Sequence, residues 1–146
     1  MCMGASQCAW GQVDAEMVTI MGRNALSVDA FLTAIKNFNQ AIDAKPFLSR
    51  PYYYRAFAKF TLEDYLGAEA DCSKSIELNP FIAEVYQLRG LCRIHNVNYK
   101  GAIEDYSRSL KEHPDDQGAR YNRALCYLQN KEYAIADIDL DYLLKR

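Results

Sequence analysis

The sequence predicts an all-α protein, an α-solenoid built of antiparallel helix pairs. The first observation behind this prediction is an internal repeat. Three of the four prolines, Pro46, Pro80 and Pro114, recur at a constant interval of 34 positions, and a fixed period of this length is typical of stacked repeat units. The second observation is the helical spacing of apolar residues within each unit, at steps of three and four residues.

The same interval aligns further positions, and these alignments have a packing reason. Small side chains at a crossing point let two helices approach to about 8–10 Å, and an aromatic residue at the start of the second helix fills the space beside them. The aligned residues form an aromatic column, an alanine column and a glycine/alanine column: Phe31, Tyr65, Tyr99 and Tyr133; Ala34, Ala68, Ala102 and Ala136; Gly22, Ala56, Gly90 and Ala124.

Four such units form one predicted domain over residues 15–146, divided as 15–48, 49–82, 83–116 and 117–146. In the first three units a proline ends the second helix. The second unit opens near Pro51, in a first helical turn, where the missing N–H costs nothing. In the third unit the helical pattern is interrupted by the polar stretch 95–98, which indicates a short turn between two helices.

The third unit also matches a known repeat pattern. Its aligned residues are Tyr86, Arg89, Gly90, Arg93, Ala102, Tyr106 and Pro114, in the register W-x2-L-G-x2-Y…A-x3-F…P. The chain therefore resembles the tetratricopeptide repeat (TPR) family, and we expect a bacterial member of it. The resemblance implies a right-handed superhelix of helix pairs with a concave groove, but it does not specify a ligand.

Two charged columns accompany the repeat. Each arginine is followed at a constant distance along the chain by an aspartate, which gives the pairs Arg55 and Asp71, Arg89 and Asp105, and Arg123 and Asp139. The first unit carries Met21 and Asn37 instead, so both positions change together. This predicts structural ion pairs between the two helices of a unit, because a buried arginine without a partner is costly. The alternative is an arginine stripe that binds an anion or a nucleic acid.

The resemblance to TPR proteins implies which residues line the concave groove. Certain positions of the first helix of each unit face it in that family, and transferring them by register gives a mostly apolar set. The set is Tyr53, Phe57, Phe60, Gln87, Leu91, Ile94, Tyr121, Leu125 and Leu128. We expect this surface to bind a peptide or a helix of a partner protein. The alternative is that several of these residues belong to the core between the helices.

Co-chaperone members of the family grip a C-terminal carboxylate with lysine, arginine and asparagine side chains from successive repeats. The corresponding positions here are Thr19 and Arg23, then Tyr54, then Glu84 and Leu88. A window that starts one repeat later does not match either. Because Glu84 would repel a carboxylate, we expect that this chain does not bind such a tail.

No arrangement of catalytic residues emerges, so we expect a protein that is not an enzyme and needs no cofactor. The sequence has no glycine-rich phosphate loop, nucleophile elbow or paired metal-ligand motif. Cys92 and His95 lack a second ligand pair at zinc-site spacing, and the acidic run 137–141 lacks the glycine of a calcium loop. The five cysteines do not form a disulfide framework, and we expect Cys92 and Cys126 to be unpaired thiols.

Composition excludes two classes of partner. Seventeen lysines and arginines against nineteen aspartates and glutamates give a net charge of −2, without the cationic surplus typical of a nucleic-acid binder. No stretch has the roughly 18 consecutive apolar residues that would predict a membrane span.

The two ends of the chain carry predictions of their own. Residues 1–14 lack a helical pattern, which predicts a disordered leader or the remnant of a signal peptide, with small residues before a potential cleavage site. An exported, periplasmic protein is favoured over a cytoplasmic one. Leu140, Leu143 and Leu144 have no following helix to cover them. This predicts either a fragment of a longer protein or a homo-oligomer that forms through the C-terminal helix.

Three functions follow from these observations. The first is a non-enzymatic protein–protein interaction scaffold that binds a peptide or helix in an apolar concave groove. The second is a self-associating structural or assembly module. The third is the targeting domain of a larger protein.

Overall fold

The structure, a computed structural model, describes residues 13–145, and in this range it contains eight α-helices and no strand. The prediction of an all-α solenoid is confirmed. The helices are α2 (Ala15–Ser27), α3 (Phe31–Ala44), α4 (Ser49–Thr61), α5 (Tyr65–Leu78), α6 (Ala83–His95), α7 (Tyr99–Glu112), α8 (Gln117–Gln129) and α9 (Tyr133–Leu144). Most of the predicted leader, residues 1–12, lies outside the described range, whereas Asp14 caps α2 by accepting hydrogen bonds from the backbone N–H groups of Glu16 and Met17.

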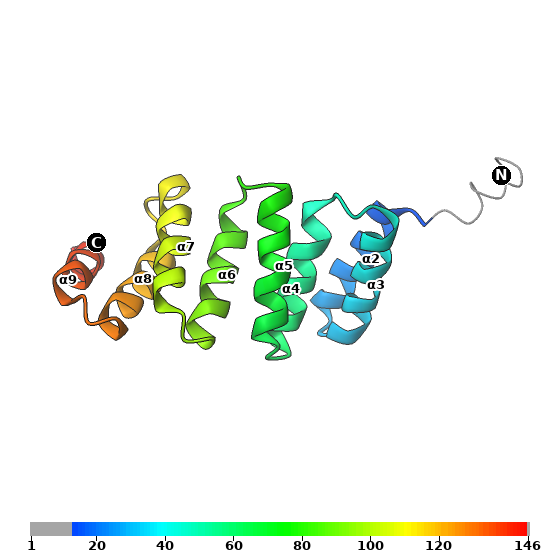
Figure 1. Cartoon of the computed structure of the whole chain (residues 1–146). Coiled ribbons are helices and arrows are strands. Elements are labelled where there is room, and N and C mark those ends of the chain that lie inside the picture. Colours follow the sequence, from blue (N-terminus) through cyan, green and yellow to red (C-terminus); the bar gives the residue numbers. More distant parts are fainter. Residues whose placement is uncertain (1–12, 146) are drawn as a thin grey trace, which may run out of the picture.

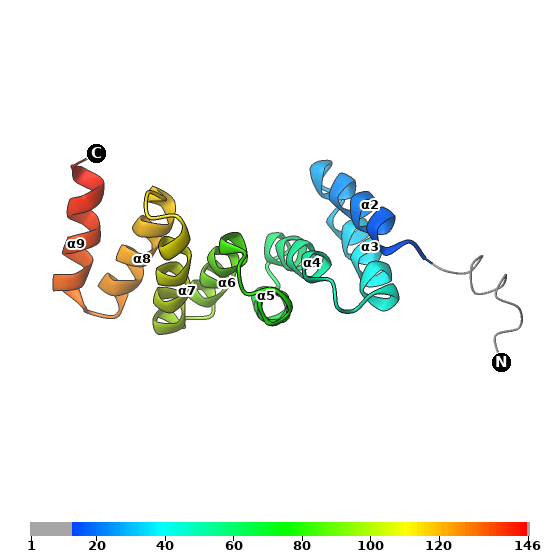
Figure 2. The ribbon, with the colours of Figure 1, turned by 90° about the horizontal axis from the view of Figure 1, so that it is seen from above.

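The helices form an elongated row that runs from α2 to α9 (Figure 1). The pairs α2/α3, α4/α5, α6/α7 and α8/α9 pack internally, and the second helix of each pair also packs on the first helix of the next. Helix α4 additionally contacts α2 and α6, so the first helices of the first three pairs are neighbours along one face. Successive pairs are rotated relative to one another (Figure 2).

The turn inside each pair adopts the same strained backbone conformation. Asp29, Glu63, Val97 and Lys131, which share one position of the repeat, all have a positive φ, between 58° and 64°. This left-handed conformation costs a residue with a side chain about 1–2 kcal/mol. The cost is highest for a β-branched residue, so Val97 is the least suitable of the four.

The prolines at the unit boundaries take part in a repeated hydrogen bond. The Tyr52 hydroxyl donates to the carbonyl oxygen of Pro46 at 2.9 Å, and the Tyr86 hydroxyl donates to that of Pro80 at 2.9 Å. In the last unit the guanidinium of Arg120 replaces the tyrosine and donates to the Pro114 carbonyl at 2.8 Å. Each bond connects the end of one unit to the first helix of the next.

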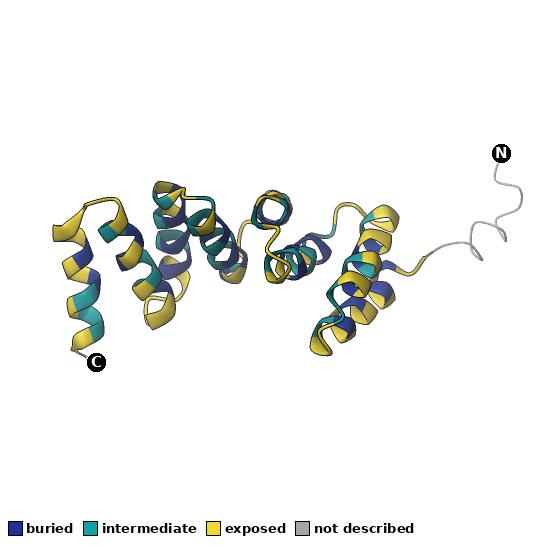
Figure 3. Ribbon diagram, turned by 90° about the horizontal axis from the view of Figure 1, so that it is seen from below, coloured by how far each residue is buried: buried dark blue, intermediate teal, exposed yellow. Residues whose placement is uncertain are grey.

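The core extends along the row and crosses the boundaries between the units. One cluster combines Ala56, Ala68 and Cys72 of the second unit with Val85, Leu88 and Cys92 of the third. Another combines Ala102, Tyr106 and Leu110 of the third with Ala119 and Cys126 of the fourth. Buried residues lie where neighbouring helices face one another, whereas much of α9 is exposed (Figure 3). A unit therefore depends on its neighbours to cover its apolar surface.

The size of the residue in the glycine/alanine column depends on the size of the residue at one position of the second helix in the same unit. A methyl group on Gly22 would collide with the Phe38 ring, and one on Gly90 would lie 2.9 Å from Cε2 of Tyr106. In the second and fourth units alanine replaces glycine at this point, and Cys72 and Leu140 replace the large rings. Glycine therefore occurs where a buried aromatic ring crosses the first helix.

Candidate functional site

The structure brings together each of the three predicted Arg–Asp pairs. Arg55 donates from Nε and Nη2 to the two carboxylate oxygens of Asp71, at 2.8 and 2.6 Å. The pairs Arg89–Asp105 and Arg123–Asp139 have the same bidentate geometry, with Nη2–Oδ1 distances of 2.7 Å. All three aspartates are buried, and the hydrogen bonds to Asp71 raise the pKa of Arg55. Bidentate pairing of this kind is strong and directional.

Each buried aspartate also binds a second cation, which is not one of the three predicted arginines. Lys59 lies 2.9 Å from Asp71, Arg93 lies 3.1 Å from Asp105, and Arg120 lies 3.1 Å from Asp139. Lys59 and Arg93 share a column and reach the carboxylate from one turn beyond the principal arginine. Arg120 instead reaches Asp139 from the preceding turn. The second cation of the fourth unit therefore occupies a different repeat position from that of the second and third units, and aligning equivalent positions does not reveal it.

The remaining guanidinium nitrogen, Nη1, of Arg55, Arg89 and Arg123 donates a hydrogen bond to the preceding unit. Nη1 of Arg55 donates to Asn39 at 2.9 Å, that of Arg89 to Ser73 at 3.2 Å, and that of Arg123 to Ser107 at 3.1 Å. Each arginine thus connects the second helix of its own unit with the second helix of the unit before. These guanidinium groups are occupied by intramolecular contacts.

One column of the predicted groove remains accessible across three units. Phe57, Leu91 and Leu125 occupy the same position of successive repeats. Phe57 is 43% exposed and Leu125 38% exposed, while Leu91 is half-buried. Tyr121, one turn before Leu125, is also exposed. These side chains form an apolar strip on the first helices of the pairs that the packing between helices leaves uncovered.

The other predicted groove residues contribute to packing as well. Tyr53 and Phe60 pack against one core cluster and Ile94 against another, and all three are half-buried. Leu128 is also half-buried. The side-chain amide of Gln87 donates to Ser109 and Asp116, at 2.7 and 2.8 Å. Among the nine predicted residues, the exposed positions are therefore Phe57, Tyr121 and Leu125.

Aromatic rings contact one another at both ends of α4. Phe38, Tyr54 and Tyr53 form a chain of ring contacts with centroid distances of 5.8 and 5.5 Å, and the Arg23 guanidinium lies 5.4 Å from the Tyr54 ring. At the other end of α4, the Tyr65 ring stacks on His95 at 4.0 Å. Tyr65 and His95 belong to different units, so no column of the repeat places them together.

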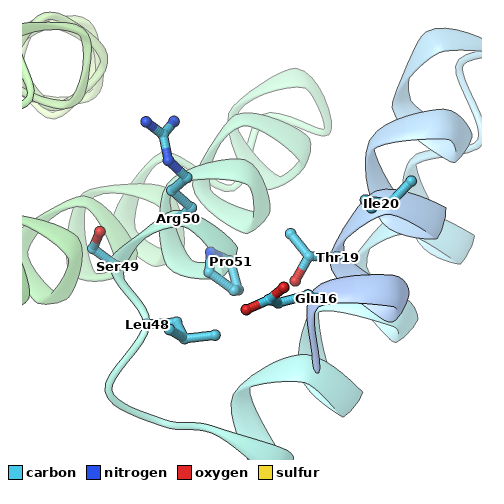
Figure 4. Close-up of a pocket in the computed structure, with 7 residues that line it drawn as sticks. All are labelled: Glu16, Thr19, Ile20, Leu48, Ser49, Arg50 and Pro51. Atoms are coloured by element: carbon cyan, nitrogen blue, oxygen red, sulfur yellow. The ribbon is translucent and has the colours of Figure 1, made fainter. Parts of the chain in front are cut away.

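A pocket of about 380 Å³ adjoins this face between α2 and the start of α4 (Figure 4). Its lining residues are Glu16, Thr19, Ile20, Leu48, Ser49, Arg50 and Pro51. Glu16 and Arg50 give the pocket both signs of charge. Deeper in the face, burial and the nearby carboxylate of Glu84 raise the pKa of the Tyr53 hydroxyl.

The described residues form no metal-binding cluster, and their three thiols are buried. No group of three His, Cys, Asp or Glu side chains converges among residues 13–145. Cys72, Cys92 and Cys126 are free and buried, and burial raises the pKa of Cys126 to about 11. A thiol with such a pKa is a weak nucleophile at neutral pH. In the same range no helix is long and apolar enough to cross a membrane.

Comparisons with known proteins agree with this architecture. A tetratricopeptide repeat family model matches residues 96–136. The crystal structure of MamA superposes with a TM-score of 0.88, at 18% identity, over 96% of this chain and 82% of that one. The first TPR domain of Spaghetti (RPAP3) bound to an HSP90 peptide has a TM-score of 0.79, at 25% identity, over 83% and 98% of the two chains.

The Arabidopsis OM64 TPR domain is a further structural neighbour. It matches with a TM-score of 0.76, at 24% identity, over 79% of this chain and 95% of that domain. No sequence in a search of curated proteins matches the chain.

Proposed function

We propose that this chain, whose fold is that of tetratricopeptide repeat solenoids, is a protein-interaction scaffold whose concave face binds an apolar segment of a partner protein. One observation carries the proposal: the column Phe57, Leu91 and Leu125 is apolar in three successive units, and packing between the helices leaves Phe57 and Leu125 exposed and Leu91 half-buried. Exposed apolar strips of this kind are typical of surfaces that bind other proteins.

The surroundings of the strip favour a helix or an extended segment as the ligand. The apolar column crosses the first helices of three units, so a ligand must be long enough to contact side chains from several units. The RPAP3 domain was solved with an HSP90 peptide, which supports peptide binding for this fold. The ligand proposed here is apolar, because Glu84 and Leu88 stand where a carboxylate-binding set would require cations.

The test is selection of ligands from a phage-displayed peptide library on the whole chain. We expect the selected peptides to share apolar anchor residues. Their affinity should fall at least about tenfold when Phe57 and Leu125 are both replaced by alanine, since buried anchor residues dominate binding energies. Leu66→Ala is the control, because Leu66 is also apolar and is more exposed, at 73%, but lies on α5.

Urea unfolding of these variants distinguishes residues of a binding surface from residues of the core. Because Phe57 and Leu125 are exposed, their replacement should leave the midpoint of urea unfolding nearly unchanged. Phe60→Ala should lower it, because Phe60 packs on the core and contacts the rings of Tyr65 and His95. Peptides that bind the double variant as tightly as the original chain would contradict the proposal.

A further inference from the structure

The turns inside the first two helix pairs carry apolar and acidic residues at equivalent positions of the repeat. We call this set the turn edge, and its members are Val28, Asp29 and Leu32 of the first unit and Leu62, Glu63 and Leu66 of the second. The four apolar residues are between 44% and 74% exposed. The two turns lie at the same edge of the row of helices (Figure 1). Contiguous exposed apolar residues of this kind are typical of surfaces that bind other proteins.

The exposure of the turn edge does not depend on the place of a unit in the row. The second unit has neighbours on both sides, because α4 packs on α3 and α5 packs on α6. Leu66 in this unit is nevertheless 73% exposed. Units stack through the sides of their helices, whereas the turns lie at the ends of the helices. A further unit at either end of the row would therefore leave these turns uncovered.

The last two units form the same turn without this pattern. All four turns contain one residue with a φ between 58° and 64°. The equivalent residues are Asn96, Val97 and Lys100 of the third unit and Asn130, Lys131 and Ala134 of the fourth. Because the turn also forms with asparagine and lysine at these positions, its geometry does not require leucine or a carboxylate there.

The turn edge carries negative charge without a matching cation. Asp29 and Glu63 are exposed, and neither has an ion-pair partner within residues 13–145. Asp64 adds a third carboxylate, which caps α5. The sequence has no lysine or arginine in residues 24–35 or 60–73. Such a surface attracts cationic ligands and repels anionic ones, such as nucleic acids and acidic membranes.

We propose that the turn edge binds an amphipathic helix of a partner protein that carries basic residues beside its apolar stripe. Neighbouring packed helices lie about 8–10 Å apart, and seven residues of an α-helix span about 10.5 Å. A helix that crosses both turns would therefore place apolar residues on them at positions i and i+7, with lysine or arginine near Asp29 and Glu63. The concave-face residues Phe57 and Leu125 lie within α4 and α8, away from the turns, so either proposal can hold without the other.

Two other occupants match the turn edge less well. Residues 1–12 of this chain contain no lysine or arginine, so they do not offer the complementary charge. A second copy of the chain offers Lys100 and Lys131 in its last two turns, but these turns also carry Glu132 and two asparagines in place of the aliphatic residues. A basic amphipathic helix combines an apolar stripe with unopposed positive charge.

Fluorescence anisotropy tests the proposal on the whole chain. The probe is a labelled helical peptide of three heptads, with leucine at positions a and d, lysine at e and g, and alanine elsewhere. We expect Asp29→Lys combined with Glu63→Lys to weaken binding about tenfold at low ionic strength, because attraction becomes repulsion. The turn accepts lysine, since Lys131 occupies the equivalent position. Glu104→Lys combined with Asp137→Lys is the control, because it reverses two exposed carboxylates outside the turns, and its effect should be much smaller.

The apolar contacts are tested separately with the same peptide. Leu32→Ser combined with Leu66→Ser should weaken binding about tenfold, because buried anchor residues dominate binding energies. This loss should persist at high salt, whereas the effect of the charge reversal should fade. Ile138→Ser is the control, since it removes an exposed apolar residue of α9. The midpoint of urea unfolding should stay nearly unchanged in each variant, because the replaced residues are exposed.

Three results would overturn the proposal. One is peptide binding that neither the charge reversal nor the leucine substitutions weaken. Another is loss of binding in the Phe57→Ala and Leu125→Ala double variant alone, which would assign the peptide to the concave face. The third is self-association of the chain in sedimentation equilibrium that the Leu32→Ser and Leu66→Ser double variant abolishes. That result would assign the turn edge to a second copy.

Discussion

At the scale of single residues, the buried aspartates explain why this solenoid tolerates arginine inside its helix pairs. Asp105 accepts hydrogen bonds from Nε and Nη2 of Arg89 and another from Arg93 on the same helix. Burial raises the pKa of Asp105, and the two arginines oppose that shift. Removing one partner from such a buried network leaves other charges uncompensated.

Asp105→Asn should therefore lower the free energy of unfolding by about 3 kcal/mol, because two half-buried guanidinium groups lose their counter-charge. Urea denaturation measures this change. Glu112→Gln is the control, since it removes an exposed carboxylate that pairs with Arg108, and we expect no measurable effect. Peptide affinity at the concave face should remain unchanged. An unaltered unfolding midpoint for Asp105→Asn would show that the pair contributes no stability.

Val97 has a left-handed backbone conformation that a β-branched residue disfavours. Its φ is 60° and the residue is 69% exposed, so packing does not offset the strain. Val97→Gly should raise the free energy of unfolding by about 1 kcal/mol, because glycine adopts a positive φ without strain. Thermal unfolding of Val97→Gly and Val97→Ala tests this expectation. A gain from alanine equal to that from glycine would point to a cause other than the backbone.

At the scale of helices, the size match between Gly90 and Tyr106 determines how closely α6 and α7 pack. Gly90→Ala would normally favour a helix by about 1 kcal/mol. Here the new methyl group would lie 2.9 Å from the Tyr106 ring, and overpacking costs about 1–3 kcal/mol. We expect a net loss of stability.

A double-mutant cycle isolates this contact. The fourth unit combines Ala124 with Leu140 at the equivalent positions, so Tyr106→Leu should make Gly90→Ala tolerable. The loss for the double variant should be smaller than the sum of the single losses by about 1 kcal/mol or more. Additive losses would show that the two side chains do not limit the approach of the helices.

At the scale of the whole molecule, the linear arrangement predicts uneven stability. The inner helices α4 to α7 are covered by neighbours on both sides along the row, whereas α2 and α9 expose apolar residues such as Met21 and Leu144. Hydrogen exchange measured by mass spectrometry should show slow exchange in α4–α7 and faster exchange in α2 and α9, because repeat arrays open from their ends. Equal protection of all the helices would indicate one cooperative unit.

Much of the fold was predictable because the repeat allows equivalent positions of the four units to be compared within one sequence. The first helices begin at residues 15, 49, 83 and 117, the first residues of the four predicted units. The paired change at Met21 and Asn37 was enough to predict the Arg–Asp pairs. Arg120 was not identified as a partner of Asp139, because its position breaks the column.

The amino-acid sequence alone specifies the period, the helix pairs and the principal arginine of each buried aspartate, because local spacing and small-residue columns repeat with every unit. Which apolar side chains remain uncovered depends on the tertiary packing. Residues such as Phe57 and Phe60 have the same character in the sequence, but the distance and rotation between successive pairs leave one exposed and press the other against the core. Exposure is a property of several units together, so no single unit can encode it.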